Sequence, residues 1–517
     1  MISKKRYLVL LLGIISCSME YGQETITDQA WQDIQAATRD ATVHIFVTSR
    51  ATNWFNPYVV GGAGASMGSG FFINEAGYIA TCSHVVDQAL SVSVTIPALG
   101  KQRLKAHVVG ICPQHDIALL QLDEKAIAAV RKVLGEVQFL EMADSDTVQR
   151  GESILALGYP GATIETDQVK GTAGVISARL NNWFQLDAPI NPGNSGGPVF
   201  NKQGLVIGIA NAGMINAQNA NFAIPINIFK TLSSDLYDHR LLKINNNGII
   251  WTFSTEEIRN YFKCPEEGGC LVCDVVQSSP AAIAGVQAHD IIYAINEYAI
   301  DNYGEIKALC DDEKMSFDSY IHQQSVGADV ILKIYRDGEP LELSLKITCK
   351  DNGVDNDSIT LKFPAYEKID YEMFAGMIIM PLTANYINVC SKDRPVLRRY
   401  LTNLYGNTPR LVVANVFSDS KISHMQSVRF GDTINEVNGE KVTTLDDFRK
   451  ALAKSVETGY VVIKTTDEIT LDTDNVVTVL SLYDSCRETV ELSQVHQYSL
   501  SESVKQLVAQ VDDSLLE

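Results

Sequence analysis

Short apolar runs separated by Gly, Asn, Asp and Pro follow one another through the first half of the chain. Val43, Ile45 and Val47 alternate with other residues, which is the pattern of a β-strand. Further runs extend to about Ile228, at 70–73, 78–81, 92–96, 117–122, 153–157, 171–177 and 205–209. Many short strands with few helices predict an all-β barrel or sandwich in this half.

Two later segments share one pattern, which indicates an internal repeat of one module. Residues 278–300 and 418–442 each hold a polar turn, a short helix, an aspartate and then a strand that ends in asparagine. The four residues are Asp290, Asp432, Asn296 and Asn438. Turn-rich residues at 245–248 and 350–358 predict the boundaries of these modules.

Helical spacing occurs near both ends of the chain. Trp31, Ile34 and Ala37 or Thr38 fall on one face of a short helix. Near the C-terminus, after the candidate cap Ser501, the apolar residues with this spacing are Val504, Leu507, Val508, Val511 and Leu515. This second helix is either a docking or oligomerisation element or a helix packed on its own domain.

Residues 1–17 have the pattern of a secretory signal peptide. Basic residues at 4–6 precede an apolar stretch at 7–15, far shorter than the roughly 20 residues of a membrane-spanning helix. Residues 14–17 then resemble a bacterial lipobox, which predicts a lipid on Cys17. The alternative is simple cleavage after Ser18. Either way, the mature chain is expected outside the cytoplasm, in a periplasm or cell envelope.

Length, charge and cysteine usage narrow the classes of function. With 517 residues the chain predicts about two to four domains. Its formal net charge of −20 repels phosphate backbones, so nucleic acid is not an expected partner. The ten cysteines are too scattered for a disulfide framework. Because Cys264, Cys270 and Cys273 lack a fourth ligand at zinc spacing, no metal is expected there, and no cofactor elsewhere.

The strongest chemical signal is the glycine-rich turn around Ser195. Glycines within 191–198 let the backbone turn tightly and let N–H groups converge on a developing oxyanion. A serine nucleophile needs a base, and His84 follows a predicted strand. Asp116, just before another strand, would hold that base in the correct tautomer. Each residue alone also fits a simple turn or surface role.

Taken together, these residues resemble the HtrA/Deg serine proteases. The matching blocks are GSGFFINEAGYIATCSHVV, HDIALLQL, LGYPG, LDAPINPGNSGGPVFNKQGLVIGI and NFAIP, in that order. The resemblance implies that His84 is the base, Asp116 the orienting acid and Ser195 the nucleophile. It also implies an oxyanion hole formed by the backbone N–H groups of Gly193 and Ser195.

The resemblance implies a mainly β fold, with a trypsin-like double β-barrel protease domain followed by two α+β PDZ-like domains. The expected segments are 24–240 for the protease domain, 245–350 for the first PDZ domain, 360–490 for a second, divergent PDZ domain and 491–517 for a helical tail. The stretch FPAYEKIDYEMFAGMIIMPLT resembles the plant-type Deg branch, as do residues 54–58.

PDZ domains receive a peptide carboxylate on loop amides and add the peptide to the following strand. The resemblance places the peptide-binding residues at Gly248, Ile249, Ile250, Ala375, Gly376 and Met377. His289 departs from the family pattern, since such modules usually have glycine before the aspartate. Cys82 and Ser83 also depart from it, because two polar residues usually precede the histidine.

The substrate pocket is expected to be lined by Ile190, Ala210 and Ala212, which surround the nucleophile in sequence. These residues include no acid that would attract Lys or Arg. We therefore expect small aliphatic side chains before the cleaved bond.

These features predict an ATP-independent endoprotease that cuts unfolded or damaged proteins outside the cytoplasm, with PDZ domains that bind peptides and regulate it. The resemblance also implies a trimer-based homo-oligomer. One alternative is a chaperone or peptide-binding scaffold with a normally resting protease domain. Others are a processing protease with one substrate, and a lipid-anchored structural protein of the envelope.

Overall fold

The computed structural model describes residues 28–161, 168–211, 221–307, 313–349, 359–402, 408–466 and 476–512. The expected signal peptide and lipidated Cys17 lie outside these ranges. Within them, no helix is long and apolar enough to cross a membrane.

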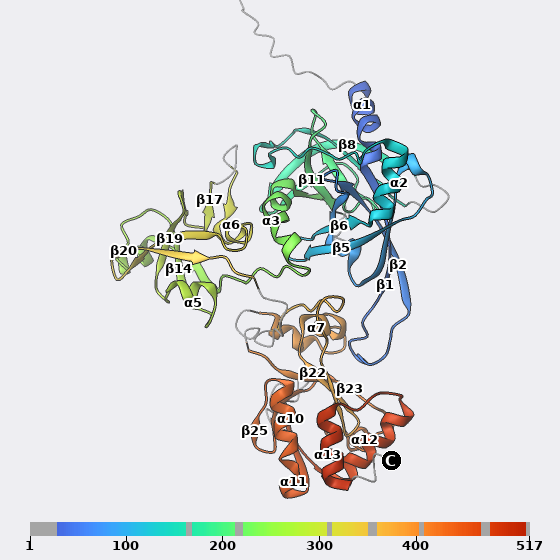
Figure 1. Cartoon of the computed structure of the whole chain (residues 1–517). Helices are drawn as coiled ribbons and strands as arrows, with labels where there is room; N and C mark the ends of the chain where they lie inside the picture. Colours follow the sequence, from blue (N-terminus) through green and yellow to red (C-terminus); the bar gives the residue numbers. More distant parts are fainter. Residues whose placement is uncertain are drawn as a thin grey trace, which may run out of the picture.

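Two closed six-stranded barrels form the N-terminal domain, which confirms the expected double β-barrel (Figure 1). The first barrel has the order β1-β2-β3-β6-β5-β4 and the second the order β10-β11-β12-β9-β8-β7. The strands of the first are β1 (Thr42–Arg50), β2 (Ala63–Phe72), β3 (Tyr78–Cys82), β4 (Ala89–Thr95), β5 (Leu104–Cys112) and β6 (Ile117–Leu122). Those of the second are β7 (Ser153–Gly158), β8 (Lys170–Leu180), β9 (Trp183–Leu186), β10 (Pro198–Phe200), β11 (Val206–Asn211) and β12 (Asn221–Pro225).

Three α-helices pack around the barrels: α1 (Asp28–Thr38), α2 (Glu124–Leu134) and α3 (Ile226–Asp238). Helix α1 lies where the sequence predicts it, and Trp31 and Ile34 pack on a hydrophobic core that includes residues of both barrels. Helix α2 begins where the Asp123 side chain accepts a hydrogen bond from the N–H of Ala126 (2.9 Å), which is an N-cap. Along β1, the predicted alternation is confirmed because Val43, Ile45 and Val47 are all buried.

The second domain is one sheet of order β13-β14-β15-β19-β20, with β16 paired to β15 and a separate β17–β18 pair. Its strands are β13 (Ile249–Phe253), β14 (Cys270–Val275), β15 (Ile291–Ile295), β16 (Tyr298–Ala299), β17 (Glu305–Ile306), β18 (Met315–Ser316), β19 (Asp329–Arg336) and β20 (Glu339–Lys346). Its helices are α4 (Glu256–Tyr261), α5 (Pro280–Ala284) and α6 (Phe317–His322). Strand β13 is therefore an edge strand.

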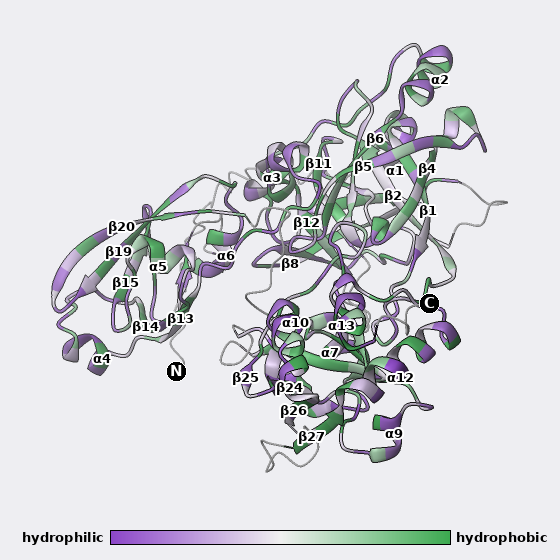
Figure 2. Cartoon of the chain, turned by 60° about the horizontal axis from the view of Figure 1, so that its bottom comes forward, coloured by the Kyte–Doolittle hydropathy of each residue, from purple (hydrophilic) through white to green (hydrophobic). Residues whose placement is uncertain are grey.

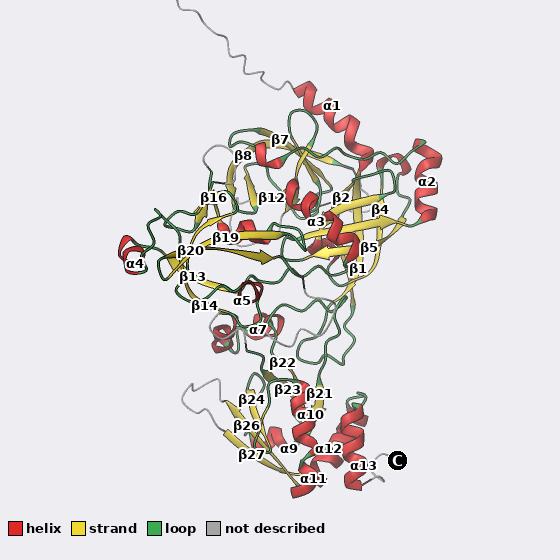
Figure 3. Cartoon of the chain, turned by 60° about the vertical axis from the view of Figure 1, so that its left-hand side comes forward, coloured by secondary structure: helices red, strands yellow, loops and turns green. Residues whose placement is uncertain are grey.

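The C-terminal domain is one sheet of order β21-β22-β23-β24-β26-β27, with β25 paired to β24. Its strands are β21 (Glu372–Phe374), β22 (Met377–Pro381), β23 (Leu411–Val416), β24 (Thr433–Val437), β25 (Glu440–Lys441), β26 (Tyr460–Thr466) and β27 (Val476–Ser481). Its helices are α7 (Ala384–Cys390), α9 (Lys421–Met425), α10 (Leu445–Ala453), α11 (Ser455–Thr458), α12 (Leu482–Val495) and α13 (Glu502–Asp512). Figure 3 shows α12 and α13 side by side next to the sheet.

The predicted internal repeat is present. Strands β13, β14, β15, β16, β19 and β20 have the same order and pairing as β22, β23, β24, β25, β26 and β27. Asn296 and Asn438 make equivalent bonds, since their Oδ1 atoms accept from the N–H groups of Ile331 (2.9 Å) and Val462 (2.8 Å). His289 keeps the turn of its repeat, with φ +77° against +87° at the equivalent Gly431. Figure 2 shows hydrophobic residues along the central strands of both repeats.

Helix α13 packs on its own domain, which decides between the two expectations for the C-terminal helix. Val504, Leu507 and Val508 are buried in the core of the C-terminal domain. Ser501 caps the helix as predicted, because its Oγ accepts from the N–H of Val504 (3.2 Å).

The β1–β2 hairpin reaches from the first barrel to the C-terminal domain (Figure 1). Trp54 at its tip is only 8% exposed and joins a core cluster of that domain. Phe55 packs on Tyr386 with ring centroids 5.6 Å apart, and Tyr58 packs on Phe417 and Tyr498. We call residues 53–58 the hairpin tip. Through these packing contacts the hairpin tip connects the protease domain to the C-terminal domain.

Candidate active site

Pairing of β3 with β6 brings the predicted base and acid together. Cys82, the last residue of β3, lies opposite Ile117, the first residue of β6. The 3-10 turn η2 (Ser83–Val86), which carries His84, follows β3 directly, and Asp116 directly precedes β6. Residues far apart in sequence are thus placed side by side at one end of the first barrel.

His84 and Asp116, the predicted base and orienting acid, contact each other at two points. The Nδ1 of His84 lies 2.6 Å from Oδ2 of Asp116, and the backbone N–H of His84 donates to Oδ1 of the same carboxylate (2.9 Å). This geometry fixes the proton on Nδ1 and leaves Nε2 free to accept one. The His84 side chain is 41% exposed, so its outer nitrogen can reach a substrate.

Two further residues hold the carboxylate, and sequence reasoning missed both. Ser83 Oγ donates to Oδ1 of Asp116 (2.8 Å), and Asn211 Nδ2 donates to Oδ2 (2.6 Å). Burial pushes the pKa of Asp116 upward, but the hydrogen bonds from His84 and Ser83 outweigh it, so the pKa lies below its ordinary value. Ser83 adjoins His84 and was visible in the sequence, whereas Asn211 comes from the second barrel with no local signal.

The turn that carries Ser195 is seated against the first barrel. The N–H of Ser69 in β2 donates to the carbonyl of Ser195 (2.8 Å). Gly196 has φ +87°, and a Cβ there would lie 2.1 Å from Thr81 Oγ1. Glycine is therefore required for this close approach. Ser195, the predicted nucleophile, thus lies next to the strands that lead to His84.

The backbone before Gly193, whose N–H is predicted to belong to an oxyanion hole, is held by one contact of the preceding carbonyl. The Pro192 carbonyl accepts from the N–H of Gly161 (3.1 Å). Since a trans peptide unit directs its C=O and N–H to opposite sides, the N–H of Gly193 faces away from that contact. Gly193 itself has φ +103°. If this peptide unit were turned over, the Pro192 carbonyl would take the place of this N–H, and the oxyanion hole could not form.

Two of the three expected pocket residues are described. Ile190 and Ala210 are both buried in the apolar core of the second barrel. The carbonyl of Ala210 also accepts from the N–H of Gly196 (2.8 Å), which places Ala210 next to the nucleophile's turn. Ala212 lies outside the described residues.

The first predicted peptide-binding loop precedes the edge strand β13, but its amides already have partners. Asn246 Oδ1 accepts from the N–H of Gly248 (3.1 Å), and Asn247 Oδ1 accepts from the N–H of Ile249 (2.8 Å). The side-chain amide of Asn247 then donates to Asp318 in α6 (2.5 Å). Ile250, the third predicted residue, pairs with Asp274 of β14.

The second predicted peptide-binding loop is the turn of a closed hairpin in the structure. Ala375 and Gly376 are the two turn residues of a β21–β22 hairpin, with φ +50° and +78°. Their neighbour Met377 is paired with Phe374, and the N–H of Ala375 donates to Thr489 Oγ1 in α12 (2.9 Å). Strand β21 occupies the edge to which a peptide would add.

His115 links the loop of Asp116 to the second domain, although no pattern in the sequence singled it out. It directly precedes Asp116, and its Nε2 donates to the carbonyl of His322 at the end of α6 (2.8 Å). Burial lowers the pKa of His115 to about 4.

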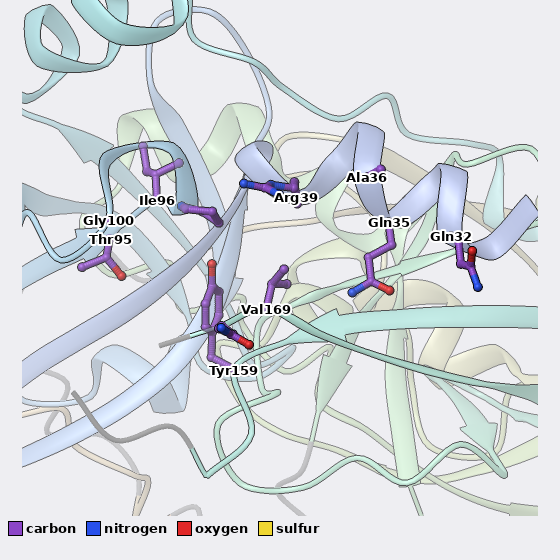
Figure 4. Close-up of a pocket in the computed structure, with 11 residues that line it drawn as sticks. Gln32, Gln35, Ala36, Arg39, Thr95, Ile96, Gly100, Tyr159 and Val169 are labelled. Carbon is purple, nitrogen blue, oxygen red and sulfur yellow. The ribbon is translucent and has the colours of Figure 1, made fainter. Parts of the chain in front are cut away.

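Figure 4 shows a hollow of about 550 Å³ between α1 and the barrels. Its lining includes Gln32, Gln35, Arg39, Ile96 and Tyr159. Of the described residues that line it, none is a histidine or a carboxylate that could act as a base.

Comparisons with known proteins match this architecture. A family model described as trypsin-like peptidase domain matches residues 68–209, and a PDZ domain model matches residues 253–347. The periplasmic serine endoprotease DegP of Escherichia coli K12 is 31% identical over 326 residues, which is 59% of this chain and 64% of DegP. A probable DegP-like periplasmic serine endoprotease of Marinomonas sp. is 27% identical over 409 residues, covering 77% of this chain and 76% of the relative.

Among solved structures, the HtrA-type protease AlgW with decapeptide is 22% identical, with a TM-score of 0.46, and the match covers 62% of this chain and 99% of AlgW. The chain spans just under two thirds of the length of E. coli DegP. It contains a trypsin-like peptidase domain followed by PDZ domains, and it is homologous to the DegP-type periplasmic serine endoproteases.

Proposed function

We propose that the protein is a serine endoprotease that degrades or processes unfolded proteins outside the cytoplasm without ATP. The observation that carries this proposal is the two-point contact of Asp116 with His84, next to the turn of Ser195. The name of the E. coli relative, a periplasmic serine endoprotease, supports the reaction and the compartment.

The proposed reaction follows from the positions of these groups. Ser195 Oγ attacks the peptide carbonyl while His84 Nε2 takes its proton, and the acyl-enzyme forms as His84 passes that proton to the leaving amine. Water then hydrolyses the acyl-enzyme by the same route. Asp116 stabilises the imidazolium, and the N–H groups of Gly193 and Ser195 stabilise the oxyanion. Removing one such donor typically lowers kcat about 100-fold to 1,000-fold.

The test uses the mature chain and a Ser195→Ala variant, each incubated with unfolded casein. Cleavage by the wild type and none by the variant supports the proposal. Equal cleavage by both identifies a contaminant or another nucleophile. If neither cuts, even with added peptides as activators, the protease proposal fails.

The PDZ domains supply a second candidate function, peptide or client binding that does not need catalysis. The observation that favours it is the free edge of β13 beside two exposed aromatic rings, Phe253 (55% exposed) and Tyr303 (67% exposed), which contact each other. Unfolded chains offer both backbone and apolar side chains to such an edge. Suppression of aggregation by Ser195→Ala would support a chaperone role; unchanged aggregation would count against it.

Cleavage preference follows from the expected pocket. Buried Ile190 and Ala210 favour small aliphatic residues before the cleaved bond. Mass spectrometry of casein fragments tests this, and frequent cuts after Lys or Arg would contradict it.

We further propose a lipid anchor on Cys17, because residues 14–17 resemble a lipobox, and a trimer-based assembly, which the family resemblance implies. Cys17→Ser is expected to move the protein from the membrane fraction to the soluble fraction of the envelope. Light scattering on the mature chain measures the oligomer, and a monomer would contradict a trimer.

A further inference from the structure

Cys82 is a buried thiol next to the proposed catalytic groups, and acyl transfer does not use it. It ends β3, two residues before His84, and is fully buried. Its Sγ lies 3.4 Å from the carbonyl of Ala210, the residue that also holds the turn of Ser195. Thus the thiol sits beneath the triad, where the two barrels meet.

This thiol completes a compact set of three metal-ligating groups. Sγ of Cys82, a ring nitrogen of His84 and a carboxylate oxygen of Asp116 all lie within 4.8 Å of one another. In the described part of the chain, this is the one group of three or more His, Cys, Asp or Glu residues with such spacing. Zinc bonds of about 2.0–2.3 Å require ligand atoms roughly 3.3–3.8 Å apart in a tetrahedral site. Shifts of about 1 Å would therefore bring these atoms to ligand positions.

The surroundings permit such shifts. The His84 side chain is 41% exposed and can move toward solvent, and water can supply a fourth ligand from that side. Asp116 is held from the opposite side by Ser83 and Asn211, so its carboxylate stays in place when His84 moves.

We propose that Cys82, His84 and Asp116 form an inhibitory site for a thiophilic divalent cation such as Zn²⁺. The inhibitory effect rests on the proposed protease function, whereas the binding itself does not. A thiolate, an imidazole and a carboxylate form a donor set that favours zinc or cadmium over magnesium or calcium. One thiolate and one carboxylate also balance the two positive charges of the ion.

Binding would stop catalysis through the tautomer of His84. The cation takes the Nδ1 lone pair, so the single proton of the neutral ring moves to Nε2. Nε2 then has no lone pair to accept the proton of Ser195. Cys82 releases its thiol proton to solvent, so each ion bound releases one proton and no group is oxidised or reduced.

The first experiment compares inhibition of casein cleavage by Zn²⁺ in wild type, Cys82→Ala and Cys273→Ala, each normalised to its own metal-free rate. Cys273 is an exposed thiol on β14 and serves as the matched control. We expect at least a tenfold higher inhibitory Zn²⁺ concentration for Cys82→Ala than for the other two, reversal by a chelator, and no inhibition by Mg²⁺. Equal sensitivity of all three overturns the proposal.

The second experiment does not depend on activity. Cd²⁺ is titrated into Ser195→Ala and into the Ser195→Ala/Cys82→Ala double variant, and the cadmium–thiolate absorption is recorded. Loss of one binding equivalent in the double variant supports the site, and an unchanged stoichiometry overturns it. Because this readout needs no turnover, a chain that cleaves nothing still tests the metal site. If Cys82→Ala does not fold, Cys82→Ser replaces it in both experiments.

Discussion

The two PDZ domains contain the same strands in the same order, yet they expose different edges. In the first, β13 ends the sheet, with exposed Phe253 beside it. In the second, the equivalent strand β22 is covered by β21, and α12 contacts the turn between them through Thr489. A three-residue strand from the preceding chain is therefore enough to close a peptide-binding edge.

The two domains also meet the protease domain differently. The first does so through polar contacts, including His115 to the His322 carbonyl and Gln323 to Asn182 (2.6 Å). The second receives the aromatic hairpin tip, with one polar contact from Asn415 to Asn56 (2.9 Å). We infer that the first PDZ domain is the one that binds peptides. The second PDZ domain would instead serve as a structural connection to the protease domain.

The largest expected effect on stability comes from removing the aromatic packing of the hairpin tip on the C-terminal domain. Trp54→Ala removes a buried ring, and loss of a large buried aromatic side chain costs about 3–5 kcal/mol. We expect a lower urea midpoint and faster proteolysis between the protease and C-terminal domains. Val60→Ala on the same hairpin, where the side chain is 70% exposed, should change stability by less than about 0.5 kcal/mol. Equal urea midpoints and equal proteolysis rates for the two variants would show that the burial of Trp54 does not stabilise the protein.

The contribution of the His115 contact with the first PDZ domain to stability should decrease in acid. Burial lowers the pKa of His115 from 6.5 to about 4 and outweighs the hydrogen bond to the His322 carbonyl, which raises it. The unfolded chain therefore takes up this proton first as the pH falls. The stabilisation is complete above pH 6.5 and is lost progressively toward pH 4, by about 3 kcal/mol in total.

Urea unfolding of wild type and His115→Gln at pH 7 and pH 4.5 measures this effect. Glutamine keeps a donor for the His322 carbonyl but does not titrate. The variant is expected to lose about 2 kcal/mol less than wild type on acidification. An identical loss in both proteins would exclude His115 as the source.

A smaller effect concerns the ligand of the first domain. Asp318 is bonded to Asn247 at the loop where a terminal carboxylate would dock, and its side chain is 40% exposed. Like charges at such a site repel by about 1 kcal/mol. Asp318→Asn should tighten binding of a hydrophobic peptide with a free carboxylate about fivefold and leave its carboxamide form unchanged. Fluorescence anisotropy measures both, and equal gains would contradict the charge argument.

The smallest effect compares the two equivalent turns. His289→Gly relieves a residue at φ +77°, at the cost of its stack on Phe262 (5.6 Å), so stability should change by less than about 1 kcal/mol. Gly431→Ala should destabilise more, because its Cβ would lie 2.9 Å from Arg394 Cγ. Thermal unfolding ranks the two, and the reverse order would contradict the steric argument.

The parts of the site that depend on local sequence were predictable. His84, Asp116 and Ser195 each lie in a distinctive motif, and the repeat was visible through Asp290 and Asp432. The short apolar runs predicted an all-β barrel or sandwich, and the family resemblance implied the two barrels.

Features that depend on contacts between distant segments were not predictable. Asn211 reaches Asp116 from the other barrel, and nothing near it in sequence signals that contact. Ala375 and Gly376 fit a peptide-binding loop by position, but the pairing of β21 with β22 depends on residues before the repeat. Residues 54–58 were conspicuous in sequence, yet their partners lie more than 300 positions away.

Strand β2 connects the hairpin tip directly to the turn of Ser195. It begins at Ala63, just after the hairpin tip that packs on the C-terminal domain. It also carries Ser69, whose N–H donates to the carbonyl of Ser195. Nine residue pairs join it to β1. Extended strands are already close to the maximum length of about 3.3–3.6 Å per residue, so they barely stretch under tension. We therefore expect a pull on the C-terminal domain to be transmitted along β2 to the turn of Ser195 with little lengthening of the strand.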